Sequence, residues 1–499
     1  MGAFYKNLKK FIGSPLFFIL TVLLFVFQAS WIAISARFPM AFDEAYHLGL
    51  IQLHAKQWSP IFLHQPSGPA TYGALTRDPS YLYHWLMSLV YRPLSSGGAS
   101  FMTQIVVMRL INVGLFTVGL VLFWLVLRKT KASESIINLT MLFFTLIPVV
   151  TLLAAHLNYD NLLVPCVAGS MLITLHIREQ LLEKKRLNIA LITWLFVLCC
   201  LSSLVKYPFL PIFAGIIVYL SLLFWKVSHR RYPVKLVTAW RKDWQKLASW
   251  NKVVLGVAAL GALALFTWTY GINLVMYQNP IPQCGEVLNN VTCQAYGPWA
   301  RNFHAALTKT GGASILYFVP NWIWGMFERL LFVINGPGGP ANYENYLAPI
   351  LAAVAAIGGL GGLGIFTWNS RKILQRDRAL AALLFIITFY IVALWGRNYH
   401  DYLHLGRMVA INGRYFVPII LPMILACALG GQHFLGDRMR LKFAMLVASA
   451  ILVLQGGGLI SFIVYSNSYW YWPQSPTAQH LNKDAQKIFK PIVWAPKIR

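Results

Sequence analysis

Charged residues are scarce in this 499-residue chain, and acidic residues are the scarcest of them. Charged residues make up 11% of the chain and hydrophobic residues 58%, whereas soluble domains are about 25% charged. A single soluble core cannot bury this apolar excess, so soluble globular proteins are excluded and lipid is the expected solvent. The formal net charge of +27 would suggest nucleic acid in a soluble protein. We expect no nucleic-acid partner here, because membrane topology accounts for the charge.

Cysteine is also scarce, with six residues in the chain. Four of them fall in apolar segments, where thiols are usually buried: Cys166, Cys199, Cys200 and Cys427. Cys284 and Cys293 lie in a polar segment, and we expect them to form a disulfide if that segment lies outside the cytoplasm. Internal repeats and an inverted duplication of hydropathy are not visible either.

Long apolar runs dominate what is present, and in a bilayer such runs must be helices because their backbone groups need internal partners. The sequence therefore predicts an all-α, polytopic membrane protein with about eleven transmembrane helices. The first run follows three lysines and is long enough to be a retained signal anchor. The expected spans are 16–36, 104–127, 135–155, 161–177, 188–204, 208–225, 253–276, 347–367, 379–396, 417–435 and 443–465.

Basic residues gather in alternate connections between these runs. Examples are the segments 128–131, 226–252 and 371–378, each rich in Lys and Arg. The positive-inside rule places these connections, with the N-terminus, in the cytoplasm. We therefore predict a multi-pass protein of the bacterial inner membrane.

The opposite connections are long and rich in Trp, Tyr, Pro and His, as expected for loops packed at the membrane interface. The first outer loop is 37–103, and a large outer loop covers 277–346. A short outer segment (397–416) and an outer C-terminal tail (466–499) complete this face, so residues 1–465 form one transmembrane unit. Apolar stretches at Pro79–Tyr91 and Ser314–Ile334 indicate interfacial or re-entrant helices.

Two adjacent carboxylates, Asp43 and Glu44, follow the first span directly. Neighbouring side chains point in different directions, so one acid can face a cavity while the other meets a structural partner. A carboxylate near hydrocarbon is a candidate general base, because desolvation raises its pKa. The alternative is that Asp43 caps a helix running to about Gln57.

Cations at the outer ends of spans are candidates for binding a phosphate. Arg414 lies in Gly413-Arg414-Tyr415-Phe416, where its guanidinium could hold a phosphate and Gly413 would allow backbone to approach a ligand. Lys206 lies between two spans with almost no loop, an expensive position for a cation. For both residues the alternative is a cation that snorkels to the interface.

Two further charged residues are candidates for a supporting role. Arg109 lies inside the second span, where an internal salt bridge would account for it. Asp160 closes a very short outer connection, either as a helix cap or as a partner of Arg109 or Lys206.

Histidines concentrate in the outer segments, among them His47. His400 and His404 have the i, i+4 spacing of a helical metal pair, but no fuller ligand pattern completes it. The sequence therefore identifies no cofactor and leaves a divalent metal ion as an alternative to interfacial hydrogen bonding.

With the Asp-Glu pair after the first span, the chain resembles the GT-C membrane glycosyltransferases. Its Gly-Arg-Tyr-apolar-apolar-Pro stretch at 413–418 resembles that of related bacterial polytopic families. That superfamily includes protein O-mannosyltransferases and bacterial aminoarabinose transferases. The arrangement of spans and long outer loops is similar over most of the chain. The resemblance implies an inverting transfer from a polyprenyl-phosphate sugar donor at the outer membrane face. Unlike larger members of the superfamily, this sequence shows no soluble outer domain, which favours a glycan or lipid-linked acceptor over a peptide.

By this resemblance Asp43 would be the general base, and Glu44 would orient it or support the loop. The departing lipid phosphate needs fixed cations. Physical reasoning, rather than the resemblance, suggests Lys206 and Arg414 for this, followed by Arg407 and Arg77, with His47 and Tyr415 as supporting residues.

Two other functions remain open from the sequence. A transporter or flippase of lipid-linked saccharides should show repeats and polar residues in broken helices at mid-membrane. A non-catalytic membrane protein of envelope assembly would tolerate substitution of Asp43 and Arg414. The clean spans and the polar residues gathered on one face favour the enzyme.

Overall fold

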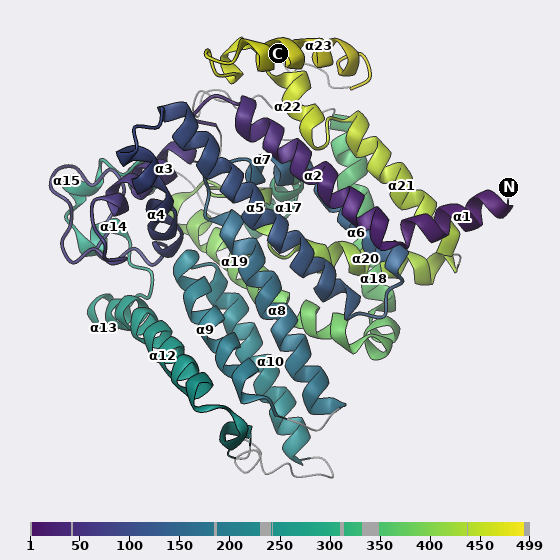
Figure 1. Ribbon diagram of the computed structural model, residues 1–499, viewed down its shortest axis with the longest axis horizontal. Coiled ribbons are helices and arrows are strands. Elements are labelled where there is room, and N and C mark those ends of the chain that lie inside the picture. Colours follow the sequence, from purple (N-terminus) through teal and green to yellow (C-terminus); the bar gives the residue numbers. More distant parts are fainter. Residues whose placement is uncertain are drawn as a thin grey trace.

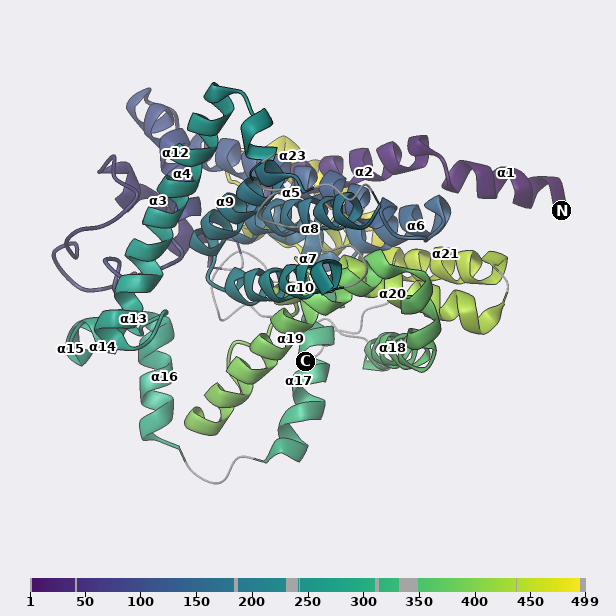
Figure 2. The same ribbon diagram turned by 90° about the horizontal axis from the view of Figure 1, so that it is seen from below.

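The computed structural model describes residues 2–40, 43–183, 187–229, 241, 243–309, 314–331, 349–436 and 438–493. Within these ranges the regular elements are helices, and the β pairing is one isolated bridge between Ala36 and Tyr471. The helices pack side by side into one bundle, with further helices over one end and one edge (Figures 1 and 2). The predicted all-α class is therefore confirmed.

Among the residues that the structure describes, seven helical stretches are long and apolar enough to cross a bilayer. They are α2 (Pro15–Ser35), α5 (Phe101–Arg128), α8 (Asp160–Leu182), α10 (Phe209–His229), α12 (Ser249–Phe266) with η1 (Thr267–Gly271) and α13 (Ile272–Tyr277), α19 (Arg378–Leu405), and α21 (Arg438–Leu454) with α22 (Leu459–Tyr465). The chain thus has the helices of a multi-pass membrane protein.

The other four predicted spans also coincide with helices. They are α6 (Glu134–Thr145) with α7 (Pro148–Ala154), α9 (Ile189–Val205), α18 (Pro349–Arg376) and α20 (Ile420–Leu435). α9 and α20 are shorter than a full span, and α6 and α7 are bent by 70° at the break between them. Eleven crossings therefore stay a prediction.

The break between α6 and α7 lies against a second break, between α21 and α22. The N–H of Gly458 donates to the carbonyl of Leu146, 3.2 Å away. Gln28 of α2 accepts a hydrogen bond of 2.7 Å from the N–H of Leu459. Non-helical backbone inside a bilayer must be satisfied by protein in this way.

Short helices build the face where the long loops lie. They are α3 (Glu44–Ala55), α4 (Leu82–Ser96), α14 (Cys284–Val287), α15 (Asn290–Cys293), α16 (Gly297–Leu307), α17 (Ile315–Leu331) and η3 (Gly413–Phe416). α4 and α17 cover the two stretches predicted as interfacial helices. In Figure 1, α3, α4, α14 and α15 gather at one end of the bundle.

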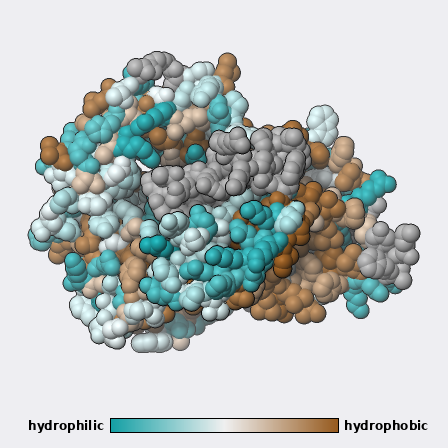
Figure 3. Space-filling view, turned by 90° about the horizontal axis from the view of Figure 1, so that it is seen from above, coloured by the Kyte–Doolittle hydropathy of each residue, from teal (hydrophilic) through white to brown (hydrophobic). Residues whose placement is uncertain are grey.

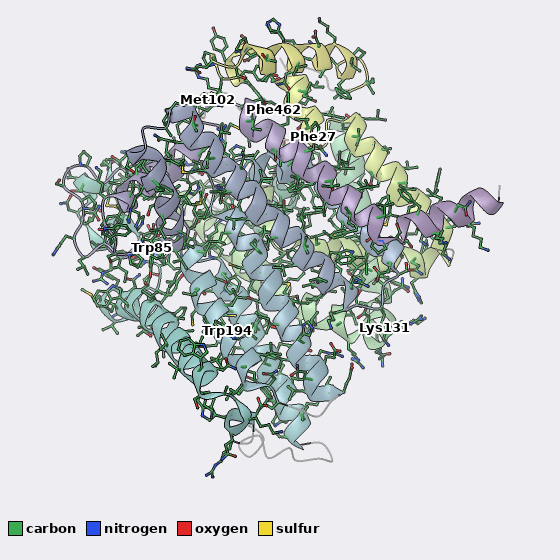
Figure 4. All side chains as sticks on the ribbon, viewed as in Figure 1. Phe27, Trp85, Met102, Lys131, Trp194 and Phe462 are labelled. Carbon is green, nitrogen blue, oxygen red and sulfur yellow. A yellow bond between two sulfur atoms is a disulfide. The ribbon has the colours of Figure 1, made fainter. Side chains whose placement is uncertain are left out.

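The basic connection 128–131 lies at the other end of the bundle, where it contacts α8 and the start of α19. Lys129 pairs with Glu179 of α8 at 2.8 Å, and the N–H of Lys131 donates to Asp377, just before α19, at 2.7 Å. Figure 4 shows Lys131 and Trp85 of α4 on opposite sides of the molecule. The basic connection 128–131 therefore lies away from the first outer loop, whereas residues 230–240 and 242 of the connection 226–252 lie outside the described residues.

The two ends of the chain contribute the remaining helices: α1 (Gly2–Ile12), η4 (Ser468–Trp470) and α23 (Pro476–Phe489). The N–H of Arg37 donates to the carbonyl of Trp470 at 2.8 Å, and Trp31 of α2 bonds Asn482 of α23 at 3.1 Å. The tail is therefore packed on the start of the first outer loop. Seen from the side of α23, hydrophobic residues gather toward one end of the surface and more hydrophilic ones toward the other (Figure 3).

Candidate functional site

Glu44 is fully engaged with Arg109 and takes a structural position. The Arg109 Nε and Nη2 atoms each lie 2.7 Å from a different Glu44 carboxylate oxygen, and both side chains are 0% exposed. The N–H groups of Met40 and Leu157 also donate to this carboxylate. Burial alone would raise the pKa of Glu44, but the charge and hydrogen bonds of Arg109 hold it below its usual value.

Arg109 also holds the backbone that leads from the first span to the Asp-Glu pair. Its Nη1 donates to the carbonyls of Ala33, at 3.2 Å, and of Ala36. The predicted internal salt bridge is thus present, and Glu44 is its partner. This geometry favours the loop-supporting role for Glu44 over direct participation in a reaction.

Asp43 points away from this pair, as expected for adjacent side chains. It occupies the N-cap position of α3, but its side chain makes no capping bond and its backbone is left-handed, with φ 63°. Its carboxylate lies 3.1 Å from Nη2 of Arg414 and its side chain is 65% exposed. The structure thus corrects two expectations, because Asp43 neither caps the helix through its side chain nor lies desolvated in hydrocarbon.

Arg414 enters from η3, 371 residues further along the chain. Asn412 holds the turn by accepting the N–H of Arg414 at 3.0 Å. Gly413 was expected to let backbone approach a ligand, but it packs on α17: a Cβ there would lie 2.4 Å from the carbonyl oxygen of Met326. The glycine therefore seats the turn on its neighbouring helix.

Lys206 is buried beside Arg414 and pairs with Asp160, with 2.6 Å between Nζ and Oδ1. Lys206 therefore pairs with Asp160 instead of snorkelling to the interface, and Asp160 holds Lys206 instead of capping a helix. The Lys206 ammonium lies 4.4 Å from the ring centre of Tyr159 and 5.1 Å from that of Tyr415. The Arg414 guanidinium lies 5.4 Å from the same Tyr415 ring, so both cations share one aromatic neighbour.

Two histidines, His47 and His84, complete the cluster, and a third, His156, lies beside it. Nδ1 of His47 lies 2.9 Å from Nε2 of His84, and the His47 ring meets Tyr159 edge-on at 4.6 Å. His156 is buried next to the Glu44–Arg109 pair, and burial lowers its pKa to about 4, despite the opposing charge of Glu44. Sequence reasoning missed His84, His156 and Tyr159; the excess of histidine in the outer segments was the available signal.

Two of the predicted phosphate ligands lie elsewhere. Arg407 is exposed after α19, where its Nη2 donates to the carbonyl of Arg301 at 2.9 Å. Arg77 lines a small cleft with Asp78, Tyr81 and Trp268. The contacts within the described ranges join neither arginine to the cluster, so both are corrected as candidates.

The metal alternative gains no ligands from the structure. The His400 and His404 rings lie 4.1 Å apart, and Nδ1 of His400 lies 3.7 Å from Asp401. Among the described residues, no group of three or more His, Cys, Asp or Glu side chains could hold a metal ion.

Cys284 and Cys293 form the predicted disulfide, with 5.9 Å between their Cα atoms. The bonded cysteines pack against Ala70, so the ring ties the large outer loop to the first one. We expect alkylation to label neither cysteine before reduction and both after it. Their labelling in the untreated native protein would contradict the bond; Cys199, buried within a span, is the control thiol that stays unlabelled under native conditions.

The cluster of charged, histidine and tyrosine side chains described above lies at the end of the bundle remote from the basic connection 128–131. It is defined as Asp43, His47, His84, Tyr159, Asp160, Lys206, Arg414 and Tyr415. No protein-family model and no curated protein sequence matches the chain. Function therefore has to be argued from this geometry.

Proposed function

We propose that the protein is a membrane glycosyltransferase of the GT-C type. It moves a sugar from a polyprenyl-phosphate donor to a glycan or lipid-linked acceptor at the outer face of a bacterial inner membrane. The single observation that carries the proposal is the contact between Asp43 and Arg414, because it places a carboxylate base beside a cation able to hold a phosphate.

Asp43 has the position of a general base. It is accessible, it is the N-cap residue of α3 just before Glu44, and its carboxylate contacts Arg414 instead of capping the helix. Left-handed backbone at a residue other than glycine is uncommon and is often found at functional sites. In the proposed reaction Asp43 takes the proton of the acceptor hydroxyl while that oxygen bonds to the sugar carbon.

The bond from the sugar carbon to the lipid phosphate breaks in the same step, and the phosphate leaves with the electron pair. Arg414 and Lys206 supply the charge that stabilises this leaving group. Arg414 presents five N–H donors, so it can hold a phosphate while keeping Asp43 in place. Lys206 is held by Asp160, which fixes its ammonium against the two tyrosine rings.

Binding of the lipid phosphate tests the cation assignment. We expect Arg414→Gln to weaken binding of a fluorescent polyprenyl phosphate without sugar by at least about tenfold, since hydrogen bonds to charged groups are worth about 1.5–3 kcal/mol. Titration of the purified protein in nanodiscs measures the affinity.

The matched control is Arg407→Gln, which removes an exposed arginine on the same side of the molecule and should leave the affinity unchanged. Equal affinities for wild type and Arg414→Gln would remove Arg414 from the phosphate site. An equal loss in both variants would indicate non-specific attraction of the lipid by surface charge.

One observation favours the alternative of a transporter for lipid-linked saccharides. The α6–α7 pair is a broken helix, and broken helices line substrate paths in many transporters. However, α7 is buried throughout, and its break is sealed by the backbone contact with Gly458. Movement of a lipid-linked sugar across proteoliposomes without any glycosylated product would support transport over transfer.

A further inference from the structure

The two histidines of the cluster are locked in one arrangement by their surroundings. Their rings are nearly parallel, 15° apart, and both side chains are almost completely buried, with His47 2% and His84 1% exposed. Nδ1 of His47 contacts Nε2 of His84 at 2.9 Å, and Nδ1 of His84 contacts the carbonyl oxygen of Ser80 at 3.1 Å. The chain of contacts therefore runs from backbone to His84 to His47.

The direction of these hydrogen bonds follows from the backbone end. A carbonyl oxygen only accepts, so Nδ1 of His84 carries the hydrogen. A neutral imidazole has one donor and one acceptor nitrogen, which makes Nε2 of His84 an acceptor. His47 must then donate from its own Nδ1, and its Nε2 is left with a lone pair.

These bond directions require a neutral His84, and the surroundings of His47 also favour its neutral form. Burial lowers the pKa of His47 well below its usual value, and the charges of Arg414 and Lys206 lower it further. Burial likewise lowers the pKa of His84, with smaller contributions from His47 and His54. A neutral His47 beside two cations is a hydrogen-bond acceptor rather than a third positive charge.

A hydrogen-bond acceptor, His47, and a donor, Lys206, both contact the ring of Tyr159. His47 meets the Tyr159 ring edge-on, and the Lys206 ammonium lies over the same ring. Asp160, which holds Lys206 through Oδ1, has a second buried oxygen, Oδ2, with no hydrogen-bond partner among the described residues. For the His47 ring, the hydrogen bond seen among the described residues is the one from Nδ1 to His84. The cations suit a phosphate, but these acceptor atoms need a ligand that donates.

We propose that Nε2 of His47 accepts a hydrogen bond from a hydroxyl of the donor sugar, and that His84 is the positioning residue that fixes the His47 tautomer. The inference rests on the proposed function. The phosphodiester of a polyprenyl-phosphate sugar has no O–H, so it cannot satisfy this nitrogen, whereas a sugar ring presents several hydroxyls. The site therefore distinguishes the sugar-bearing lipid from the spent lipid phosphate above the second pKa of that monoester, about 6, where the spent phosphate has lost its last O–H.

A binding comparison tests the sugar contact. The probes are bare polyprenyl phosphate and polyprenyl phosphate carrying glucose, mannose or galactose, each titrated into the protein in nanodiscs. His47→Leu should weaken the tightest sugar-bearing probe by about tenfold and leave the bare lipid unchanged. His400→Leu, an exposed histidine on α19, is the matched control and should change neither. An equal loss for both probes in His47→Leu, or no loss, overturns the proposal.

Nitrogen NMR of histidine-labelled protein tests the tautomer without any ligand. In wild type, Nε2 of His47 should resonate as an unprotonated nitrogen, with His47→Leu providing the assignment. His84→Gln should preserve this state, because the amide oxygen of Gln can accept a hydrogen bond from Nδ1 of His47. His84→Leu removes the acceptor and should give a mixture of the two His47 tautomers. A protonated Nε2 in wild type overturns the inference. Wild-type protein that shows the expected His47 tautomer but binds none of the lipid probes would show that the proposed sugar-donor lipid is wrong. The proposed contact between His47 and the sugar would then be wrong as well.

Discussion

Asp43→Asn is expected to lower the rate of sugar transfer by about 10²–10⁴-fold, the usual contribution of a positioned general base. The amide keeps the size of the side chain and an oxygen for Arg414, and Asn tolerates left-handed backbone as Asp does. Fold and lipid binding should therefore be retained while the ability to take a proton is lost. Release of lipid phosphate and formation of glycosylated acceptor in proteoliposomes measure the rate.

Asp401→Asn is the matched control, because Asp401 lies on the same side of the molecule and pairs with exposed Arg397. It should transfer sugar at the wild-type rate. Asp43→Asn transferring at the wild-type rate would contradict the enzymatic proposal, since the proposal rests on the carboxylate of Asp43 beside Arg414. If neither Asp43→Asn nor Arg414→Gln changes the function of the protein, a non-catalytic role in the envelope would be favoured.

Arg109→Met is expected to destabilise the protein by about 3–5 kcal/mol, because it leaves the carboxylate of Glu44 buried without its partner. The same loss is expected for Glu44→Gln, which leaves the arginine uncompensated. The double variant, Glu44→Gln with Arg109→Met, should recover most of the stability, since an uncharged replacement of a buried pair is often neutral. Thermal unfolding followed by circular dichroism in detergent measures the differences.

Arg397→Met is the control for this series, since its ion pair with Asp401 is exposed and should be worth about 0–1 kcal/mol. A double variant as unstable as either single variant would mean that the hydrogen bonds from Met40 and Leu157, rather than the charge pair, hold the loop. Transfer activity in a folded double variant would show that Glu44 is structural. A folded but inactive double variant would return Glu44 to the reaction.

The helices could be predicted from sequence because each apolar run carries its own requirement for internal hydrogen bonds. Their breaks could not be predicted in full. Pro148 is visible inside the third run, but the fit of the α6–α7 break against Gly458 depends on two segments that are far apart in the chain. Whether a broken helix is tolerated depends on that tertiary partner.

The candidate site shows the same division. That one of Asp43 and Glu44 would be structural followed from their adjacency, but the identity of Arg109 as the partner of Glu44 did not. Lys206 and Arg414 could be selected because a cation at a span end is costly, whereas Arg77 and Arg407 resembled them only in charge. The histidine pair depends on a carbonyl of the first outer loop, which leaves no mark in composition or spacing.

The bonds between Arg37 and Trp470 and between Ser35 and Trp472 have a consequence for biogenesis. The backbone just before Asp43 is anchored by residues that are synthesised long after it, and so is Arg414, the partner of Asp43. A polypeptide interrupted before these segments has Asp43 but lacks both the anchor and Arg414. The proposed site can therefore assemble only after these distant segments have been synthesised and packed.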